Sequence, residues 1–185
     1  EISCSLVGSE MCIRDSNNGW RELTDLSEIP FVYEQLEDFE NKIIYYESSR
    51  GCPFSCSYCL SSIDKKLRFR DLELVRRELQ FFLDHRVPQV KFVDRTFNCR
   101  HEHAMEIWRY ILEHDNGVTN FHFEISADLL RDEEIQLMSK MRPGLIQLEI
   151  GVQSTNTDTI HAIHRHMDLV KLCLLYTSPS PRDCS

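Results

Sequence analysis

The chain has 185 residues, of which 42% are hydrophobic and 28% charged, and its formal net charge is −9. This size and apolar content suit one globular domain, whereas the acidic balance argues against a nucleic-acid or anionic-membrane partner, whose phosphates it would repel. Because there is neither a membrane-spanning apolar run nor a basic segment followed by an apolar one at the N-terminus, we expect a cytoplasmic protein.

Both ends of the chain carry segments that look foreign to it. Residues 173–183, CLLYTSPSPRD, can be back-translated into DNA whose reverse complement encodes LVGSEMCIRD, the string at residues 6–15. One oligonucleotide joined to both ends of a DNA fragment produces this relation, and its sequence resembles a sequencing-library adaptor. We therefore expect residues 1–16 and 173–185 to be non-native and to contribute nothing to folding.

The chain between these ends divides into a linker and a repeating unit. Residues 17–41 are polar and acidic, are interrupted by Pro30 and show no sustained period, so we expect a linker laid against a neighbour. Four strand-helix units follow. Strands are predicted at 42–49, 89–94, 121–126 and 145–152, and helices at 71–85, 101–114, from Asp132 to about Lys140 and from about Thr157, with Asp71 and Asp132 as N-caps and Met167 on the last helix.

The order and polarity of these strands predict a barrel-like sheet. Regular alternation of strands and helices predicts a parallel sheet covered by helices. On the third strand Phe121, Phe123 and Ile125 alternate with polar residues, and the fourth strand alternates in the same way. A parallel sheet buried on both faces should be apolar on both. We therefore predict an α/β fold, a partial TIM-type (β/α) barrel of about four units over residues 42–172, with functional groups at the C-terminal strand ends.

Three of the eight cysteines crowd into one loop after the first strand. Cys52, Cys56 and Cys59 lie in the stretch GCPFSCSYC, Cys99 lies far from them, and the other four fall in or beside the end segments. In a chain without a secretory signal, this pattern indicates metal or redox chemistry rather than disulfides. We expect Cys99 to be an idle thiol.

Three thiolates in one loop suit more than one inorganic centre. Structural zinc takes four protein ligands, and no fourth ligand stands at zinc-knuckle spacing in the sequence. A [4Fe-4S] cluster can be held by three cysteines, which leaves one iron open to another ligand. A non-catalytic zinc-binding module and an electron-transfer iron-sulfur module remain the alternatives to an enzyme.

The cysteine loop, with Tyr58 before its third cysteine, resembles the C-x-x-x-C-x-aromatic-C motif of the radical SAM superfamily, and the resemblance covers most of residues 42–168. It implies that Cys52, Cys56 and Cys59 hold a [4Fe-4S] cluster and that S-adenosylmethionine ligates the open iron. An electron donor would reduce the cluster, which would then cleave this small-molecule cofactor to a 5'-deoxyadenosyl radical. The substrate and the residues that act on it stay unknown.

The resemblance also implies contacts to S-adenosylmethionine from the strand ends. Asp94 follows the second strand, where the family often has a Gly-Gly-Glu turn, which is absent here; a rim carboxylate paired with Arg95 or Arg100 is the alternative. Arg165 could reach the methionyl carboxylate or simply be solvated. The remaining predicted contacts are Tyr58, Glu124, Ser126, Glu149 and Gln153, and for the two glutamates a structural ion pair inside the barrel is the alternative.

A narrower resemblance concerns RELTDLSEIPFVY, VKFVDRTFN and FHFEISADLL, which are similar to segments of radical SAM proteins with an N-terminal cobalamin-binding domain. The D-x-H-x-x-G motif of that domain does not occur in the chain, so cobalamin is expected in the full-length parent only. The family core normally has six strand-helix units. We therefore expect the parent to extend on both sides, and this fragment to be inactive alone.

Overall fold

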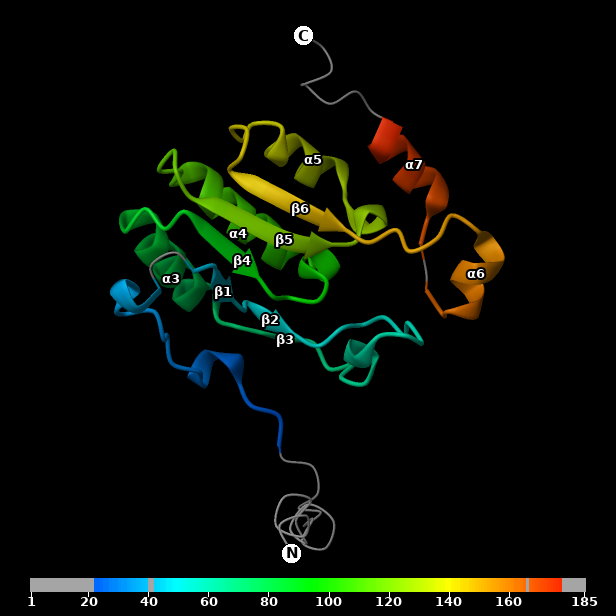
Figure 1. The fold of residues 1–185 in the computed structure, drawn as a ribbon, viewed down its shortest axis with the longest axis horizontal. Helices are drawn as coiled ribbons and strands as arrows, with labels where there is room; N and C mark the ends of the chain where they lie inside the picture. The colour runs from blue at the N-terminus through cyan, green and yellow to red at the C-terminus, as the bar shows by residue number, and fades with distance from the viewer. Residues whose placement is uncertain (1–21, 40–41, 166, 178–185) are drawn as a thin grey trace, which may run out of the picture.

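A four-stranded parallel sheet forms the centre of the computed structural model, which describes residues 22–39, 42–165 and 167–177. The strand order is β1-β4-β5-β6, so each strand lies beside the one contributed by the preceding unit (Figure 1). The strands are β1 Ile44–Tyr46, β4 Gln89–Phe92, β5 Asn120–Ile125 and β6 Ile146–Ile150. A sheet that grows in one direction is the geometry of an incompletely wound barrel, which confirms the predicted α/β architecture.

Helices follow the strands and cover one face of the sheet. Helix α3 (Leu72–Asp84) comes after β1 and the cysteine loop, α4 (His101–Glu113) follows β4, and α5 (Asp132–Met138) follows β5. After β6 come the short helix α6 (Thr157–Ala162) and α7 (Leu169–Thr177). Figure 1 shows α3, α4 and α5 along the same side of the sheet. In the part of the chain that the structure describes, no helix is long and apolar enough to span a membrane.

The predicted helix starts are partly right. Asp71 caps α3, because its Oδ1 accepts hydrogen bonds from the backbone N–H groups of Glu73 at 2.9 Å and Leu74 at 3.2 Å. The N-cap predicted at Asp132 is wrong by one residue. Arg131 occupies the cap, and Asp132 is the first helical residue, where a carboxylate is favoured by the helix dipole.

The helix predicted from Thr157 is shorter than expected. It starts there, capped by the Asn156 side chain, but it ends at Ala162. His164 has φ 54°, a left-handed conformation that stops a helix. The prediction that Met167 lies on this helix is therefore wrong.

The apolar face of the sheet packs on the helices through aromatic side chains. Phe121, Phe123 and Ile125 of β5 are buried, while the residues between them are not, so the predicted alternation is confirmed. The ring of Phe123 lies 4.5 Å from that of Phe92, 4.4 Å from that of Phe97 and 5.9 Å from that of Trp108, centroid to centroid. The opposite face of the sheet is left to polar side chains.

A two-stranded antiparallel ribbon closes the base of the cysteine loop. Its strands are β2 (Ser49–Arg50) and β3 (Arg68–Phe69), so the first predicted strand, 42–49, is in fact two short strands that belong to different sheets. Gly51 follows β2 with φ 98°, and a Cβ atom there would lie 2.5 Å from the carbonyl oxygen of Lys66. Only glycine lets the two sides of the loop approach so closely.

Residues 22–39 pack against the first unit. This segment forms the 3₁₀ helices η1 (Leu26–Glu28) and η2 (Leu36–Phe39), and Leu26 is buried. Phe31 lies 5.5 Å and Tyr33 lies 5.7 Å from Phe82 of α3, centroid to centroid. The neighbour against which we expected this segment to lie is thus the sheet together with α3. The assignment of the segment as a linker stays a prediction.

Helix α7 crosses the predicted boundary between residues 172 and 173. Leu172 is buried, and Leu175 packs against the core. That the tail from residue 173 contributes nothing to folding stays a prediction. The Lys171 Nζ atom donates to the carbonyl oxygens of Asp128 at 2.7 Å and Leu130 at 2.5 Å. The adaptor origin of the tail stays a prediction, and residues 1–16 and 178–185 lie outside the described residues.

A buried ion pair joins the N-terminal segment to the first unit. Arg70, directly after β3, pairs with Glu78 of α3 at 2.5 Å, and the two side chains are 7% and 3% exposed. Tyr46 of β1 donates to Glu78 at 2.6 Å, and Arg70 also donates to the carbonyl oxygen of Leu26. Buried charges need such complete pairing, because an unpaired one carries a large desolvation penalty.

We predict that Arg70→Met lowers the free energy of unfolding by about 3–5 kcal/mol, because Glu78 would be left buried without its partner. The matched control is Arg76→Met, since Arg76 pairs with Glu73 and Glu106 at the protein surface. Its loss should stay below about 1 kcal/mol. Urea denaturation measures both variants, and equal losses would show that the buried pair contributes no more than a surface pair.

Candidate functional site

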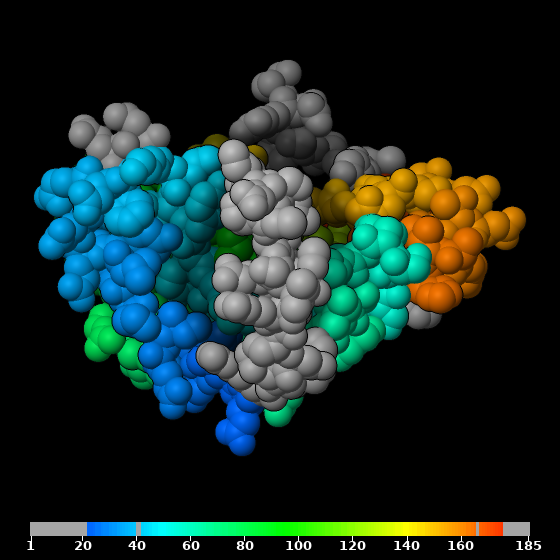
Figure 2. Space-filling view, turned by 60° about the horizontal axis from the view of Figure 1, so that its bottom comes forward, coloured from blue at the N-terminus to red at the C-terminus, as the bar shows by residue number. Residues whose placement is uncertain are grey.

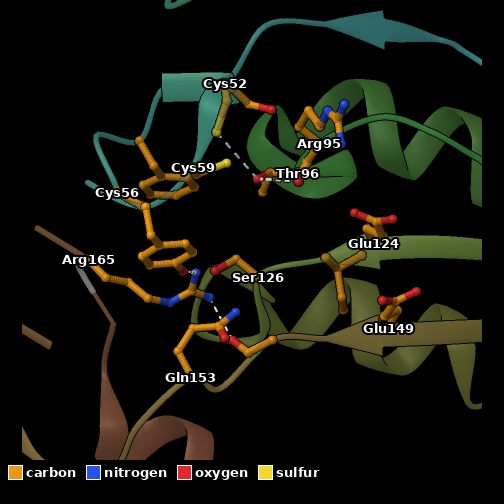
Figure 3. A pocket seen from close by; sticks show the side chains of 15 residues that line it. Cys52, Cys56, Cys59, Arg95, Thr96, Glu124, Ser126, Glu149, Gln153 and Arg165 are labelled. Carbon is orange, nitrogen blue, oxygen red and sulfur yellow. Dashed lines mark hydrogen bonds between the residues drawn. The ribbon is translucent and has the colours of Figure 1, made fainter. Parts of the chain in front are cut away.

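One cavity of about 230 Å³ lies where the cysteine loop meets the C-terminal ends of β4, β5 and β6 (Figure 3). All the predicted site residues border it except Asp94. The cysteine loop contributes Cys52, Cys56, Tyr58 and Cys59, and the segments after the strands contribute Arg95, Thr96, Ser126, Gly151, Gln153 and Arg165, with Glu124 and Glu149 from the strands themselves.

The three cysteines of the loop are free thiols on one side of this cavity. Cys52 and Cys56 are buried, and Cys59 is half-buried. The loop is held at both ends: the Cys52 N–H donates to the carbonyl oxygen of Asp64 at 3.0 Å, and the Ser57 N–H donates to that of Ile163 at 2.9 Å. The loop is therefore fixed by backbone hydrogen bonds.

The three cysteines of the loop supply soft sulfur donors to the cavity. Within residues 22–39, 42–165 and 167–177, no three His, Cys, Asp or Glu side chains converge closely enough to hold one metal ion. One zinc ion would bring its thiolates to about 2.3 Å from a single point. A [4Fe-4S] cluster instead takes each thiolate on a different iron, and three soft sulfur donors on one side of one cavity suit it.

Two glutamates face each other across the neighbouring strands. Glu124 of β5 and Glu149 of β6 are register partners. The Lys91 Nζ atom lies 3.7 Å from Glu124 Oε1 and 3.1 Å from Glu149 Oε2, and His122 Nε2 lies 3.1 Å from the same Glu149 oxygen. The hydrogen bond from Lys91 lowers the pKa of Glu149 below its usual value.

The ion pair that we kept as the alternative for these glutamates is therefore present, with Lys91 as its cation. Both carboxylates also border the cavity, so a cofactor contact stays a prediction for each. Sequence reasoning missed Lys91, although its signal was available. It stands between the buried Val90 and Phe92 on β4, which places it on the polar face of the sheet.

Arg165 joins the cysteine loop to the end of β6. Its Nη2 atom donates to the Gly151 carbonyl oxygen at 2.6 Å, and its Nη1 atom donates to the Tyr58 hydroxyl at 3.1 Å. Figure 2 shows the segments around residues 60 and 160 side by side on the surface, in agreement with the backbone bond from Ser57 to Ile163. No carboxylate of the described residues lies within ion-pair distance of Arg165.

Two further residues of the site escaped prediction. Asn98 clamps the backbone of Ser126: its Nδ2 donates to the Ser126 carbonyl oxygen at 2.9 Å, and its Oδ1 accepts from the Ser126 N–H at 3.0 Å. Thr96 borders the cavity with its Oγ1 atom 3.8 Å from the Cys52 Sγ atom. Both follow β4 at its C-terminal end, where the barrel geometry places functional groups.

Asp94 is buried and does not border the cavity. Its carboxylate accepts hydrogen bonds from the Ser48 N–H at 3.0 Å, the Ser48 hydroxyl at 2.8 Å and the Ser49 hydroxyl at 2.5 Å. The alternative of a rim carboxylate paired with Arg95 or Arg100 is therefore wrong, because the side chain turns inward to these serines. Asp94 ties the end of β4 to the turn that precedes the cysteine loop.

Burial raises the pKa of Asp94 to about 6 in spite of these three hydrogen bonds. The folded protein thus binds this proton more tightly than the unfolded chain. The stability that the protonated Asp94 contributes is therefore fully present below the ordinary pKa of 3.8. It is lost as pH rises through about 6. We predict that the free energy of unfolding of the wild type, relative to Asp94→Asn, falls in this window by up to about 1.4 kcal/mol per pH unit.

Urea denaturation at a series of pH values measures this difference. Asp94→Asn is the right reference because asparagine fills the same space and does not ionise. A difference between the two proteins that stays constant over the window would show that the buried carboxylate titrates as it does in water.

The sequence profile of the Radical SAM superfamily matches residues 46–171. The chain therefore belongs to the radical SAM superfamily, a family of enzymes. The match begins within β1 and includes the whole cysteine loop and the strand ends that border the cavity.

Several curated relatives are methyltransferases by name. The chain is 25% identical over 130 residues to the bacteriochlorophyllide d C-12(1)-methyltransferase of Chlorobaculum tepidum, covering 68% of the chain and 28% of that protein. It is 35% identical over 63 residues to an uncharacterized methyltransferase of Pyrococcus horikoshii, covering 32% and 14%. It is 25% identical over 127 residues to the 2-(S-pantetheinyl)-carbapenam-3-carboxylate methyltransferase of Streptantibioticus cattleyicolor, covering 65% and 18%. The chain spans less than a third of each relative.

Solved structures agree on the fold. The radical S-adenosylmethionine methyltransferase TsrM of Kitasatospora setae, with cobalamin and a [4Fe-4S] cluster bound, superposes with a TM-score of 0.63 at 16% identity, over 80% of this chain and 29% of TsrM. The same enzyme with tryptophan and an S-adenosylmethionine analogue gives 0.62 at 16% identity, over 80% and 30%. At this identity the likeness shows the fold alone.

Proposed function

We propose that Cys52, Cys56 and Cys59 bind a [4Fe-4S] cluster and that S-adenosylmethionine binds beside it in the same cavity. The observation that carries this proposal is that three free thiols and polar side chains at the ends of three strands border one cavity. When bound and reduced by an electron donor, the cluster would supply the electron that cleaves S-adenosylmethionine to a 5'-deoxyadenosyl radical.

The charges around the cavity suit a zwitterionic ligand. Arg165 offers a guanidinium without a carboxylate partner in the described chain, so it can bind the methionyl carboxylate in a charge-assisted pair. Glu149, whose pKa Lys91 lowers, stays ionised and, with Glu124, can attract the methionyl ammonium group. These groups stand on different elements, after α6 and on β5 and β6, so the ligand would be held across the cavity.

The other strand-end residues would bind the nucleoside part. The Ser126 hydroxyl and the Gln153 amide can hydrogen-bond ribose or adenine, and Tyr58 offers a ring beside the third cysteine. Asp94 keeps a supporting role here, because it fixes the turn before the cysteine loop. A cytoplasmic location and the lack of a nucleic-acid partner stay predictions.

Two rival functions use the same thiols. A zinc module would bind one ion for stability or docking, and an electron-transfer module would carry a cluster that S-adenosylmethionine does not touch. Anaerobic reconstitution followed by iron, sulfide and zinc counts distinguishes the zinc module from the proposed cluster protein. Stoichiometric zinc without sulfide would contradict the proposal. The electron paramagnetic resonance spectrum of the reduced cluster separates the second, since only an open iron changes it when S-adenosylmethionine is added.

We predict that replacing any one of Cys52, Cys56 or Cys59 by alanine abolishes a stable four-iron cluster, because each thiolate holds a different iron. Cys99→Ala is the matched control. Cys99 is a half-buried thiol whose pKa burial raises to about 11, which disfavours the thiolate that a metal needs. Iron and sulfide content per chain is the measurement. Iron loss in Cys99→Ala with retention in a loop variant would overturn the assignment of ligands.

We propose methyl transfer as the reaction of the whole protein, which rests on the names of the relatives. Because the chain spans less than a third of each, the test needs the complete gene product with its cluster loaded, incubated with methyl-labelled S-adenosylmethionine. S-adenosylhomocysteine, 5'-deoxyadenosine and a labelled small molecule are expected. 5'-Deoxyadenosine without S-adenosylhomocysteine would contradict methyl transfer. Cobalamin, which TsrM binds, is proposed only for the full-length parent and not for this fragment.

A further inference from the structure

One side-chain hydroxyl, from the segment after β4, contacts the cysteine loop. The Thr96 Oγ1 atom lies 3.8 Å from the Cys52 Sγ atom, and both residues are 8% exposed (Figure 3). In the part of the chain that the structure describes, it is the only side chain that hydrogen-bonds a sulfur of the three loop cysteines. It also donates to the carbonyl oxygen of its neighbour Arg95 at 2.9 Å.

The single proton of this hydroxyl serves one acceptor at a time. While Cys52 is a thiol, its S–H group can donate a hydrogen bond to Thr96 Oγ1. The Thr96 hydroxyl then donates its own proton to the Arg95 carbonyl oxygen. A metal-bound thiolate has no proton to give and only accepts. A hydrogen bond to a charged acceptor is about twice as strong as one to a neutral carbonyl, so the hydroxyl should turn toward sulfur.

The backbone around Thr96 holds the hydroxyl in place. Thr96 follows β4 directly after Arg95, and its carbonyl oxygen accepts from the Cys99 N–H at 3.1 Å in the 3₁₀ turn η4 (Phe97–Cys99). Phe97 is fully buried, which anchors this turn in the core. The hydroxyl is thus presented to the cysteine loop by a turn that a buried side chain anchors.

We propose that Thr96 donates a hydrogen bond to the Cys52 thiolate of the loaded cluster and thereby raises the reduction potential of the cluster. Reduction adds negative charge to the cluster and its ligands, and a donor at a ligand sulfur stabilises the more negative state. Thr96 is in this sense a residue that tunes the cluster, and it touches neither substrate nor the open iron. The proposal rests on the function proposed above for the three cysteines.

The test compares the wild type with Thr96→Val, which keeps the shape and removes the hydroxyl, and with Thr96→Ser, which keeps the hydroxyl. All three are reconstituted anaerobically and studied without S-adenosylmethionine. We expect a lower midpoint potential in Thr96→Val and a value near that of the wild type in Thr96→Ser, from redox titrations followed by electron paramagnetic resonance. Electron-nuclear double resonance after exchange into D₂O should show a proton coupling that Thr96→Val lacks.

The outcomes separate this inference from the proposed function. If the wild type holds no four-iron cluster, the proposed function fails. If all three proteins hold the cluster with one potential and the same exchangeable couplings, the function stands and the inference is overturned. Should Thr96→Val not retain four irons, Thr96→Ala takes its place, and an unchanged exchangeable coupling in that variant overturns the inference as well.

Discussion

The strict alternation of side chains along the parallel strands is the constraint on which the rest of the structure depends. On β5 the ring of Phe123 enters the aromatic core, and the next side chain, Glu124, must then point to the opposite face. Because all four strands run in the same direction, their C-terminal ends meet at one edge. One face is therefore committed to packing, and the other is free to carry charge.

The cysteine loop depends on this edge for its position. The loop leaves the sheet after β1. Asp94, which follows β4, accepts hydrogen bonds from Ser48, which precedes β2, and from Ser49, the first residue of β2. The β2–β3 ribbon closes the loop at its base, and Gly51 allows the close approach of its two sides. At the far side Arg165 bridges the Tyr58 hydroxyl and the end of β6. Residues of several segments thus fix where the three thiols stand.

Charge is distributed over the cavity in a way that favours a ligand with both signs. The ammonium group of Lys91 lies between Glu124 and Glu149, so the two register-paired carboxylates do not simply repel each other. Arg165 lacks such a partner in the described chain and stands on the other side of the cavity.

The sequence by itself determined the periodic elements and the identity of the thiol loop, because these follow from local patterns. Helical spacing placed α3 and α4, strand parity assigned Glu124 and Glu149 to the polar face, and the resemblance in the cysteine motif identified the family. Only the tertiary structure decided which polar groups meet. Lys91 between the glutamates and Thr96 against Cys52 depend on register and on turn conformation, which bring together residues far apart in the chain. For the same reason Asp94, predicted as a cofactor contact with a rim carboxylate as the alternative, lies inside and does not border the cavity. Local sequence shows that a carboxylate follows a strand, but only packing decides whether serines or solvent contact it.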